Sequence, residues 1–519
     1  MIFNSYAFIF VFLPLVWLGF FGLAKSSVRL SVVWLCLASL FFYGWWNPKF
    51  LTLLLGSILF NYWLGCRLAP TRPAAFAPAV RRWTLVAGIS VNLLLLGYFK
   101  YLNFFISTVN ALGTQHWALL DIVLPLGISF FTFTQIAFLV DSSRGEARDF
   151  DFLRYVLFVT YFPHLIAGPV LHHRQVMPQF EDEKMYRFSY ENLSIGLLIF
   201  AIGLFKKVML ADDLANQVTP VFDQAAQGVA PKFLLAWTAA LAYTFQLYFD
   251  FSGYSDMALG VSRMFGVHLP LNFASPYKAK NISEFWRCWH MTLSQFLRDY
   301  LYIALGGNRR GPLRRYSNLL VTMLLGGLWH GANWTFVVWG ALHGVLLVLQ
   351  HAWTGWLARL NLPAPSRWLA LILHVVSIGL TFLAVVMGWI FFRADSLTSA
   401  LLIVQGCLGM NGLSIAAAQG WLTQLGIALF TWAGQPVVYE GVFELSSAMR
   451  DFNPSTVGRL LLICSLLVWL APSSQRIAQR WSVPAAPWVM VLRGGWVAFL
   501  LLVSLSHIDR ISTFIYYQF

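Results

Sequence analysis

The run LGGLWHGANWTFVVWGALHG, residues 325–344, is apolar or small at nearly every position, yet it contains two histidines. Gly327 and Gly331, and then Gly340 and Gly344, have the spacing of small-xxx-small pairs, which let membrane helices approach closely. The pattern predicts helices packed tightly inside a membrane. Ionisable side chains at that depth are rare and indicate function by default, so the histidines are the first candidates for a site.

The composition of the whole chain supports a membrane protein. Of 519 residues, 59% are hydrophobic and 11% are charged, with a mean hydropathy of +0.67. An ordinary soluble domain has about 25% charged residues, so a soluble globule is excluded. The net charge of +14 is typical of a membrane protein whose basic residues meet anionic lipid, and we expect no nucleic-acid partner. The five cysteines are scattered without a CxxC pair, so neither disulfides nor a metal site is expected.

Apolar runs long enough for membrane spans recur along the chain, beginning with 7–24, 30–47, 50–66 and 84–105. Basic residues gather after the first and third of these runs, at Lys25, Arg29, Arg67, Arg72, Arg81 and Arg82. The positive-inside rule therefore places the N-terminus outside the cytoplasm, in a multi-pass membrane protein. Further runs lie at 122–141, 154–171, 193–210, 231–251, 286–305, 318–350, 368–393, 398–410, 418–435, 457–472 and 485–506.

These runs predict an all-α polytopic protein with about 10–13 spans. Some runs are short or broken, as in PHLIAGP (163–169), and predict re-entrant segments, because interrupted backbone at membrane depth must be buried in protein. The stretch 436–456 is more polar and predicts a surface loop. We see neither an internal repeat nor a separate soluble domain, so residues 1–519 are taken as one integral-membrane domain, with core motifs in 125–344 and C-terminal helices in 368–506.

A second polar cluster interrupts the apolar run YTFQLYFDFSGYSDMALG, residues 243–260. Its polar members include Gln246, Tyr248, Asp250, Ser252 and Asp256. Gly253 is expected to break the helix and let the backbone line a cavity. A buried network that fixes helix packing and a functional cluster are both compatible with this pattern.

A third stretch, residues 281–315, joins a predicted helix to a strongly basic flank. Asn281 and Glu284 resemble a capping box, so a helix should start there, with Trp286 and His290 on one face. The basic residues are Arg287, Arg298, Arg309, Arg310, Arg314 and Arg315. They fit either a cytoplasmic loop that obeys the positive-inside rule or a site that attracts phosphates of a cytoplasmic donor.

The two histidines of 325–344 differ in position. His330 has apolar flanks on both sides and should lie near mid-span, whereas His343 is nearer the end of the run and fits a structural role. Burial favours a neutral imidazole, which can act as a general base beside a hydroxyl. The chain has no HExxH and no GxSxG motif. On this evidence an acyl-transfer site and a proton relay in a transporter both remain open.

Six ordered motifs resemble the membrane-bound O-acyltransferases, in the branch of the bacterial alginate O-acetyltransferase membrane subunit. They are FNYWLG (60–65), PLGISFFTFTQIAFLVD (125–141), FPHLIAGPV (162–170), YFDFSGYSDMALG (248–260), EFWRCWHMTLSQFLRDYLYIALGGNR (284–309) and MLLGGLWHGANWTFVVWGALHG (323–344). The ending IYYQF (515–519) is also similar to that branch. One departure is Cys288, which stands where the branch usually has a second arginine, as in FWRRWH.

The resemblance implies a protein of the bacterial inner membrane with a periplasmic N-terminus. It also implies a ring of helices around a central tunnel, in which a cytoplasmic acyl donor meets an acceptor from the other side. His330 in the WHG motif would be the essential histidine and His290 a second one, with Trp329 or Asn333 orienting the ring or stabilising an oxyanion. The donor would be a thioester, acetyl-CoA first and a carrier-bound acyl group second, with no bound cofactor. Arg298, Arg309 and Arg310 would then attract its phosphates.

The implied acceptor is a hydroxyl of an exopolysaccharide, alginate first and cellulose or another surface polymer as alternatives, reached through a periplasmic acetyltransferase partner. Two other functions are kept in view. A transporter or export channel would use the same polar residues without a thioester, and a scaffold would only anchor a periplasmic enzyme.

Overall fold

The computed structural model describes the chain except for residues 73–74, 114–115, 148–149, 167, 361–362, 415–426, 430, 439–453, 484, 509–514 and 516–519. Most of the predicted span 418–435, of the predicted loop 436–456 and of the ending 515–519 therefore lies outside the described residues. The described part is helical, apart from two-residue parallel strands β1 (Leu413–Ser414) and β2 (Val437–Val438).

Seven helical segments in the described ranges are long and apolar enough to cross a membrane, or eight if a bent pair is counted as one span. The seven are η1–α1 (Ala7–Phe12, Leu13–Ala24), α3 (Lys49–Leu68), α4–η2–α5 (Pro78–Leu96, Gly97–Tyr101, Leu102–Leu112), α10–η4–α11 (Tyr190–Phe205, Lys206–Ala211, Asp212–Ala226), α16 (Trp334–Arg359), α17 (Arg367–Arg393) and α22 (Pro487–Leu505). The bent pair, α20 (Pro454–Leu470) and α21 (Ser474–Trp481), turns by 56°. The predicted class, an all-α polytopic membrane protein, is confirmed.

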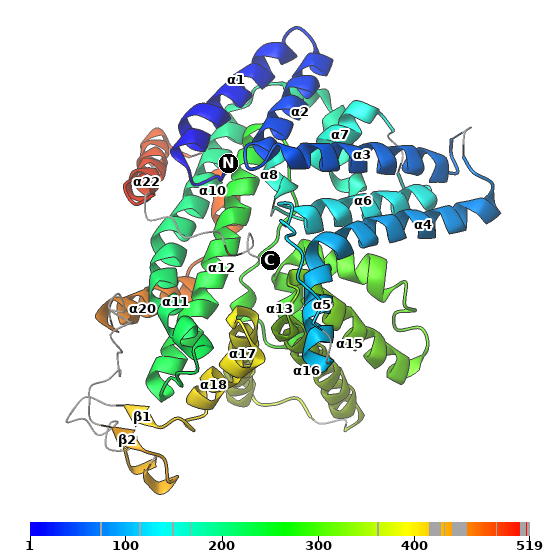
Figure 1. Cartoon of the computed structure of the whole chain (residues 1–519). Coiled ribbons are helices and arrows are strands. Elements are labelled where there is room, and N and C mark those ends of the chain that lie inside the picture. Colours follow the sequence, from blue (N-terminus) through cyan, green and yellow to red (C-terminus); the bar gives the residue numbers. More distant parts are fainter. Residues whose placement is uncertain are drawn as a thin grey trace.

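Within the described residues, the number of long apolar helices is smaller than the 10–13 spans expected for the whole chain, because several apolar runs fold into shorter pieces. Three shorter apolar helices are α2 (Val28–Gly44), α6 (Ile128–Ser143) and α18 (Leu397–Cys407). Still shorter elements are α7 (Phe152–Thr160), α8 (Phe162–Leu165), α9 (His173–Glu181), η3 (Glu183–Tyr186), η5 (Pro276–Lys278), α13 (Ile282–Cys288), α14 (Met291–Phe296) and η6 (Leu297–Tyr302). In Figure 1, α13 lies between the long pair α10 and α12 (Phe233–Met264) on one side and α15 (Gly311–His330) with α16 on the other.

The longest helix is α12, which runs without a break for 32 residues. The predicted break at Gly253 is wrong, and the glycine serves close packing instead. A Cβ on Gly253 would lie 2.8 Å from the carbonyl oxygen of Gly203 on α10, and one on Gly203 would lie 2.6 Å from the carbonyl oxygen of Gly253. Gly196 of α10 and Gly260 of α12 make the same kind of contact two helical turns away. The two backbones therefore touch, which places the polar residues of α12 inside the protein.

The run 318–350 folds into two helices, α15 and α16, with the break directly after His330. A Cβ on Gly327 would lie 2.3 Å from the carbonyl oxygen of Phe336, and one on Gly340 would lie 2.4 Å from that of Met323. The predicted close approach at these glycines is confirmed. Because the two helices pack this tightly, the short connection between them holds the end of α15 in a fixed place.

Candidate active site

His330 ends α15 and is 3% exposed. Its imidazole lies in an aromatic cage, with ring centroids 4.9 Å from Trp329, 5.1 Å from Trp339 and 5.2 Å from Phe392. Trp329 is in turn stacked on Phe133 of α6, at 5.3 Å and 22°. The ring of His330 is thus surrounded by side chains from three helices, α15, α16 and α17, and α6 packs behind one of them.

His290 reaches the same place from a different part of the chain. The predicted helix start at Asn281 is confirmed, since the Asn281 side chain accepts a hydrogen bond from the Glu284 N–H at 2.9 Å. The prediction that Trp286 and His290 share one helical face is wrong, because α13 ends at Cys288. His290 adopts a left-handed conformation, φ 42° and ψ 53°, and α14 begins after it. This turn, rare for a non-glycine residue, brings the two imidazole centroids to 6.3 Å.

A brace of buried hydrogen bonds holds this turn. The Met291 N–H donates to the Asn272 carbonyl at 3.0 Å, and the Thr292 hydroxyl donates to the Asn272 side chain at 2.6 Å. The same hydroxyl accepts from the Val170 N–H at 2.9 Å. Strained backbone persists only where its surroundings over-determine it and is concentrated at functional sites. Asn272 and Thr292 are therefore the residues that fix His290, and sequence reasoning did not single them out.

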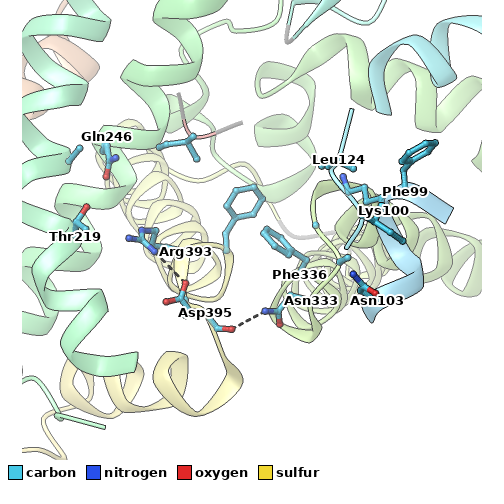
Figure 2. A pocket seen from close by; sticks show the side chains of 17 residues that line it. Phe99, Lys100, Asn103, Leu124, Thr219, Gln246, Asn333, Phe336, Arg393 and Asp395 are labelled. Carbon is cyan, nitrogen blue, oxygen red and sulfur yellow. Dashed lines mark hydrogen bonds and ion pairs between the residues drawn. The ribbon is translucent and has the colours of Figure 1, made fainter. Parts of the chain in front are cut away.

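A cavity of about 550 Å³ lies next to this site, although neither His330 nor His290 is among its lining residues. Its wall includes Gly331, the residue after His330, and Phe392, whose ring touches the imidazole. Figure 2 shows two polar walls, with Lys100 on one side and Gln246 on the other. The cavity is thus a polar space that begins one residue from the candidate histidine.

Asn333 borders this cavity, but its amide is occupied. The side chain caps α16 by accepting from the Thr335 N–H at 3.0 Å, and it donates to the Asp395 carbonyl at 2.9 Å. Arg393 lies 3.7 Å from the Asp395 carboxylate, so the three residues link the start of α16 to the end of α17 (Figure 2). In this structure Asn333 shapes the mouth of the cavity.

The polar residues of α12 do not all face the histidines. Gln246 lines the cavity, and its side-chain oxygen has no hydrogen-bond partner among the described residues. Ser252 is buried on the same helix. Tyr248 lines a separate, mostly apolar cavity of about 240 Å³, on the side of α20 to α22.

The two carboxylates of α12 are paired with lysines. Asp250 lies 2.7 Å from the Lys207 ammonium and accepts from the Ile515 N–H at 3.0 Å. Asp256 lies 2.6 Å from the ammonium of Lys206, the residue before Lys207. These contacts hold α12 to η4 and α21, as the packing interpretation of the polar cluster predicts. Of the α12 candidates, Gln246 is the one that borders the cavity next to His330.

Comparison with known proteins decides the family. The family model described as "MBOAT, membrane-bound O-acyltransferase family" matches residues 115–391. The peptidoglycan O-acetyltransferase of Helicobacter pylori is 44% identical over 80% of this chain and 81% of its own length. The chain belongs to the membrane-bound O-acyltransferase family.

Other relatives extend this result. The probable alginate O-acetylase AlgI of Pseudomonas aeruginosa is 44% identical over 77% of this chain and 73% of its own length. A teichoic acid D-alanyltransferase of Streptococcus thermophilus is 29% identical over 47% of this chain and 60% of its own length. The protein is therefore an acyltransferase, which favours the enzyme over the transporter and scaffold alternatives. The roles of individual site residues in this membrane-bound O-acyltransferase remain predictions.

Two of the three predicted phosphate-attracting arginines, Arg309 and Arg310, lie at the opposite end of α15 from His330. Arg298, Arg309 and Arg310 are all exposed, and Arg298 pairs with the neighbouring Asp299 at 2.7 Å. Since α15 has 20 residues, this basic end is about 30 Å from His330. Arg309 and Arg310 thus face the medium at one end of the helix whose other end carries the site. Arg298 is separate from them: it follows Leu297 of η6, whose side chain would lie 3.1 Å from a Cβ on Gly326, near the His330 end of α15.

Two residues after Arg298, a buried polar network around Tyr300 joins three elements. The Tyr300 hydroxyl donates to Asp141 at 2.7 Å and lies 3.0 Å from His172 Nδ1. Arg144 lies over the Tyr300 ring at 5.8 Å. Burial lowers the pKa of His172, because it disfavours the imidazolium. The sequence did not predict this polar network, since its members are far apart in sequence and none interrupts an apolar run conspicuously.

His343 fits the structural role predicted for it. It is fully buried and accepts a hydrogen bond from the Trp286 indole N–H at 3.3 Å. Its ring lies 4.8 Å from Trp339, which separates it from His330. The residue that sequence reasoning overlooked next to His330 is Lys100, which stood in the predicted span 84–105 as an intramembrane cation.

Proposed function

We propose that this membrane-bound O-acyltransferase moves an acetyl group from a cytoplasmic thioester, acetyl-CoA, to hydroxyl groups of a cell-surface polysaccharide on the other side of the membrane. The observation that carries the proposal is the meeting of His290 and His330, from separate segments, at 6.3 Å, with Gly331, the residue after His330, in the wall of a polar cavity. Two buried imidazoles beside a space for a polar substrate suit general-base chemistry on a hydroxyl.

The charge distribution along α15 supports a reaction that crosses the membrane. The helix starts in a basic segment that includes Arg314 and Arg315, which the positive-inside rule assigns to the cytoplasm. It ends at His330, next to the cavity, about 30 Å away. The basic end would receive the donor and the cavity would receive the acceptor.

The chemistry assigned to the residues is a direct transfer. The imidazole of His330 takes the proton of the acceptor hydroxyl as its oxygen attacks the thioester carbonyl. The carbon–sulfur bond breaks, the new ester forms, and the proton returns to the leaving thiolate. Such proton transfer contributes typically 10²–10⁴-fold to the rate. His290, held by its brace, is placed to orient the reacting groups.

The acceptor class rests on the relatives. A peptidoglycan O-acetyltransferase and an alginate O-acetylase both match this chain at 44% identity, so alginate is not favoured over peptidoglycan on identity alone. What the two polymers share is a sugar hydroxyl. We propose that a periplasmic partner either presents this hydroxyl at the cavity or receives the acetyl group there.

The experiment uses purified protein in nanodiscs with radiolabelled acetyl-CoA. It compares wild type with His330→Ala and His290→Ala for thioester cleavage and for label passed to de-acetylated alginate or peptidoglycan. His374→Ala is the matched control, because His374 is also in an apolar helix, α17, but is exposed on its surface. We expect turnover to fall by at least 10²-fold in His330→Ala and to be unchanged in His374→Ala. Wild-type turnover in His330→Ala would refute the assignment.

A further inference from the structure

Lys100 is attached by hydrogen bonds to the backbone that carries His330. Its ammonium donates to the carbonyl of Trp329 at 2.5 Å, to the carbonyl of His330 at 3.3 Å and to the Ser129 hydroxyl at 3.2 Å. The next residue, Tyr101, donates its hydroxyl to the carbonyl of Leu328 at 2.8 Å. Two adjacent side chains therefore hold the last three carbonyls of α15.

These carbonyls need partners from outside the helix. The last four carbonyls of an α-helix have no partner within it, and in a membrane each unsatisfied group is costly. α15 does not end in the left-handed turn that often satisfies them, since Gly331 is extended at φ −162° and ψ 151°. A lysine at this position both donates to the carbonyls and complements the negative end of the helix dipole.

The local backbone of the lysine is adapted to this contact. Lys100 and Tyr101 end η2, a π-helical segment from Gly97 to Tyr101 within an otherwise α-helical span. Single π-helical turns in α-helices are frequent at functional sites. The side chains of Lys100 and Tyr101 both reach α15, although consecutive residues of a regular α-helix point about 100° apart.

We propose that Lys100 is a positioning residue for His330, which acts by fixing the end of α15 and with it the imidazole. Lys100 is not assigned as a base or as a substrate ligand, because its three N–H groups already have three partners. This inference deepens the proposed function and rests on it for its catalytic readout. A misplacement of about 1 Å at a reacting group costs about 10²-fold, which sets the expected effect.

The test compares Lys100→Met, Lys100→Arg and wild type in nanodiscs, with kcat and KM for acetyl-CoA and with amide hydrogen exchange of the peptide covering 328–333. Met has a similar length but cannot donate, whereas Arg keeps the charge and the donors. We expect Lys100→Met to lower kcat about 10²-fold with KM within 3-fold of wild type, and to speed exchange at 328–333. Lys100→Arg should recover at least 10-fold of the lost kcat.

The matched control is Lys278→Met. Lys278 also donates its ammonium to a carbonyl beyond a helix end, that of Ala471 after α20, at 3.1 Å. It therefore repeats the chemistry of Lys100 away from His330, and we expect Lys278→Met to leave kcat unchanged. Wild-type kcat in Lys100→Met would overturn the proposal, as would an equal loss of kcat in Lys278→Met.

Tyr101→Phe keeps the proposal testable if Lys100→Met does not fold. It loosens the same helix end without removing the ammonium, and we expect a smaller fall in kcat, about 5-fold, with faster exchange at 328–333. Faster exchange with wild-type kcat would show that the helix end can loosen without affecting transfer, which would overturn the proposal. Hydrogen exchange is measured without turnover, so it tests the role of Lys100 separately from the proposed function. Intact transfer in His330→Ala would refute the proposed function. Unchanged exchange at 328–333 in Lys100→Met, or in Tyr101→Phe if Lys100→Met does not fold, would refute the role of Lys100 in fixing the end of α15.

Discussion

Replacing Thr292 with valine should separate the geometry of the site from the stability of the protein. The change keeps the side-chain shape but removes the hydroxyl that donates to Asn272 and accepts from the Val170 N–H. The Val170 N–H is then buried without a partner, which costs about 1–3 kcal/mol. A non-glycine residue in the left-handed region, such as His290, stores strain of about 1–3 kcal/mol. Because the two energies are similar, loss of the brace lets the His290 turn relax.

The expected result of Thr292→Val is a fall in transfer of about 10²-fold, from a displacement of His290 by about 1 Å. The assay is label transfer from acetyl-CoA in nanodiscs, together with thermal unfolding in detergent. Thr160→Val is the control, since the buried hydroxyl of Thr160 donates only to the Val156 carbonyl of its own helix, at 2.8 Å. Transfer within 2-fold of wild type in Thr292→Val, with a lowered unfolding temperature, would refute the idea that the brace serves His290.

Three further substitutions test packing, the buried ion pairs and the cavity. Gly327→Leu should abolish folded protein in detergent extracts, because its Cβ would meet backbone at 2.3 Å, whereas Gly355→Leu, which has nothing within 4 Å, should express normally. Lys207→Met should destabilise the fold by about 3–5 kcal/mol, by leaving buried carboxylates uncompensated, and adding Asp250→Asn should recover part of the loss in unfolding temperature. Arg393→Gln should raise KM for the polymer acceptor by about 5-fold and leave KM for acetyl-CoA unchanged, since Arg393 lines the cavity assigned to the acceptor; an unchanged KM for the polymer would remove the cavity from acceptor binding.

The sequence predicted the features that depend on composition and on the spacing of residues close together in the chain. The membrane class follows from the hydropathy of the runs, and the close approach at Gly327 and Gly340 follows from their spacing. The 325–344 stretch could be predicted as a candidate site because a histidine is conspicuous among apolar residues. The pairing of His330 with His290 could be expected only through the family resemblance.

Other features depend on contacts between distant parts of the chain. The left-handed turn at His290 is set by Asn272, Thr292 and Val170, so the helical periodicity of 281–297 gave the wrong face. The glycine at 253 was taken for a helix break because its partner, Gly203, lies 50 residues earlier in the chain. The sequence alone does not distinguish a glycine that breaks a helix from one that allows a neighbouring helix to pack closely.

The measurement that tests the central claim most directly is the sidedness of transfer. Radiolabelled acetyl-CoA is sealed inside proteoliposomes, and de-acetylated alginate or peptidoglycan, with a periplasmic extract, is supplied outside. His330→Ala vesicles are the reference. If the site joins a donor path to an acceptor cavity across the bilayer, label appears on the external polymer while the vesicles stay sealed, and only with wild-type protein. Label that reaches polymer only when donor and acceptor share one compartment would contradict a transfer across the membrane at His330.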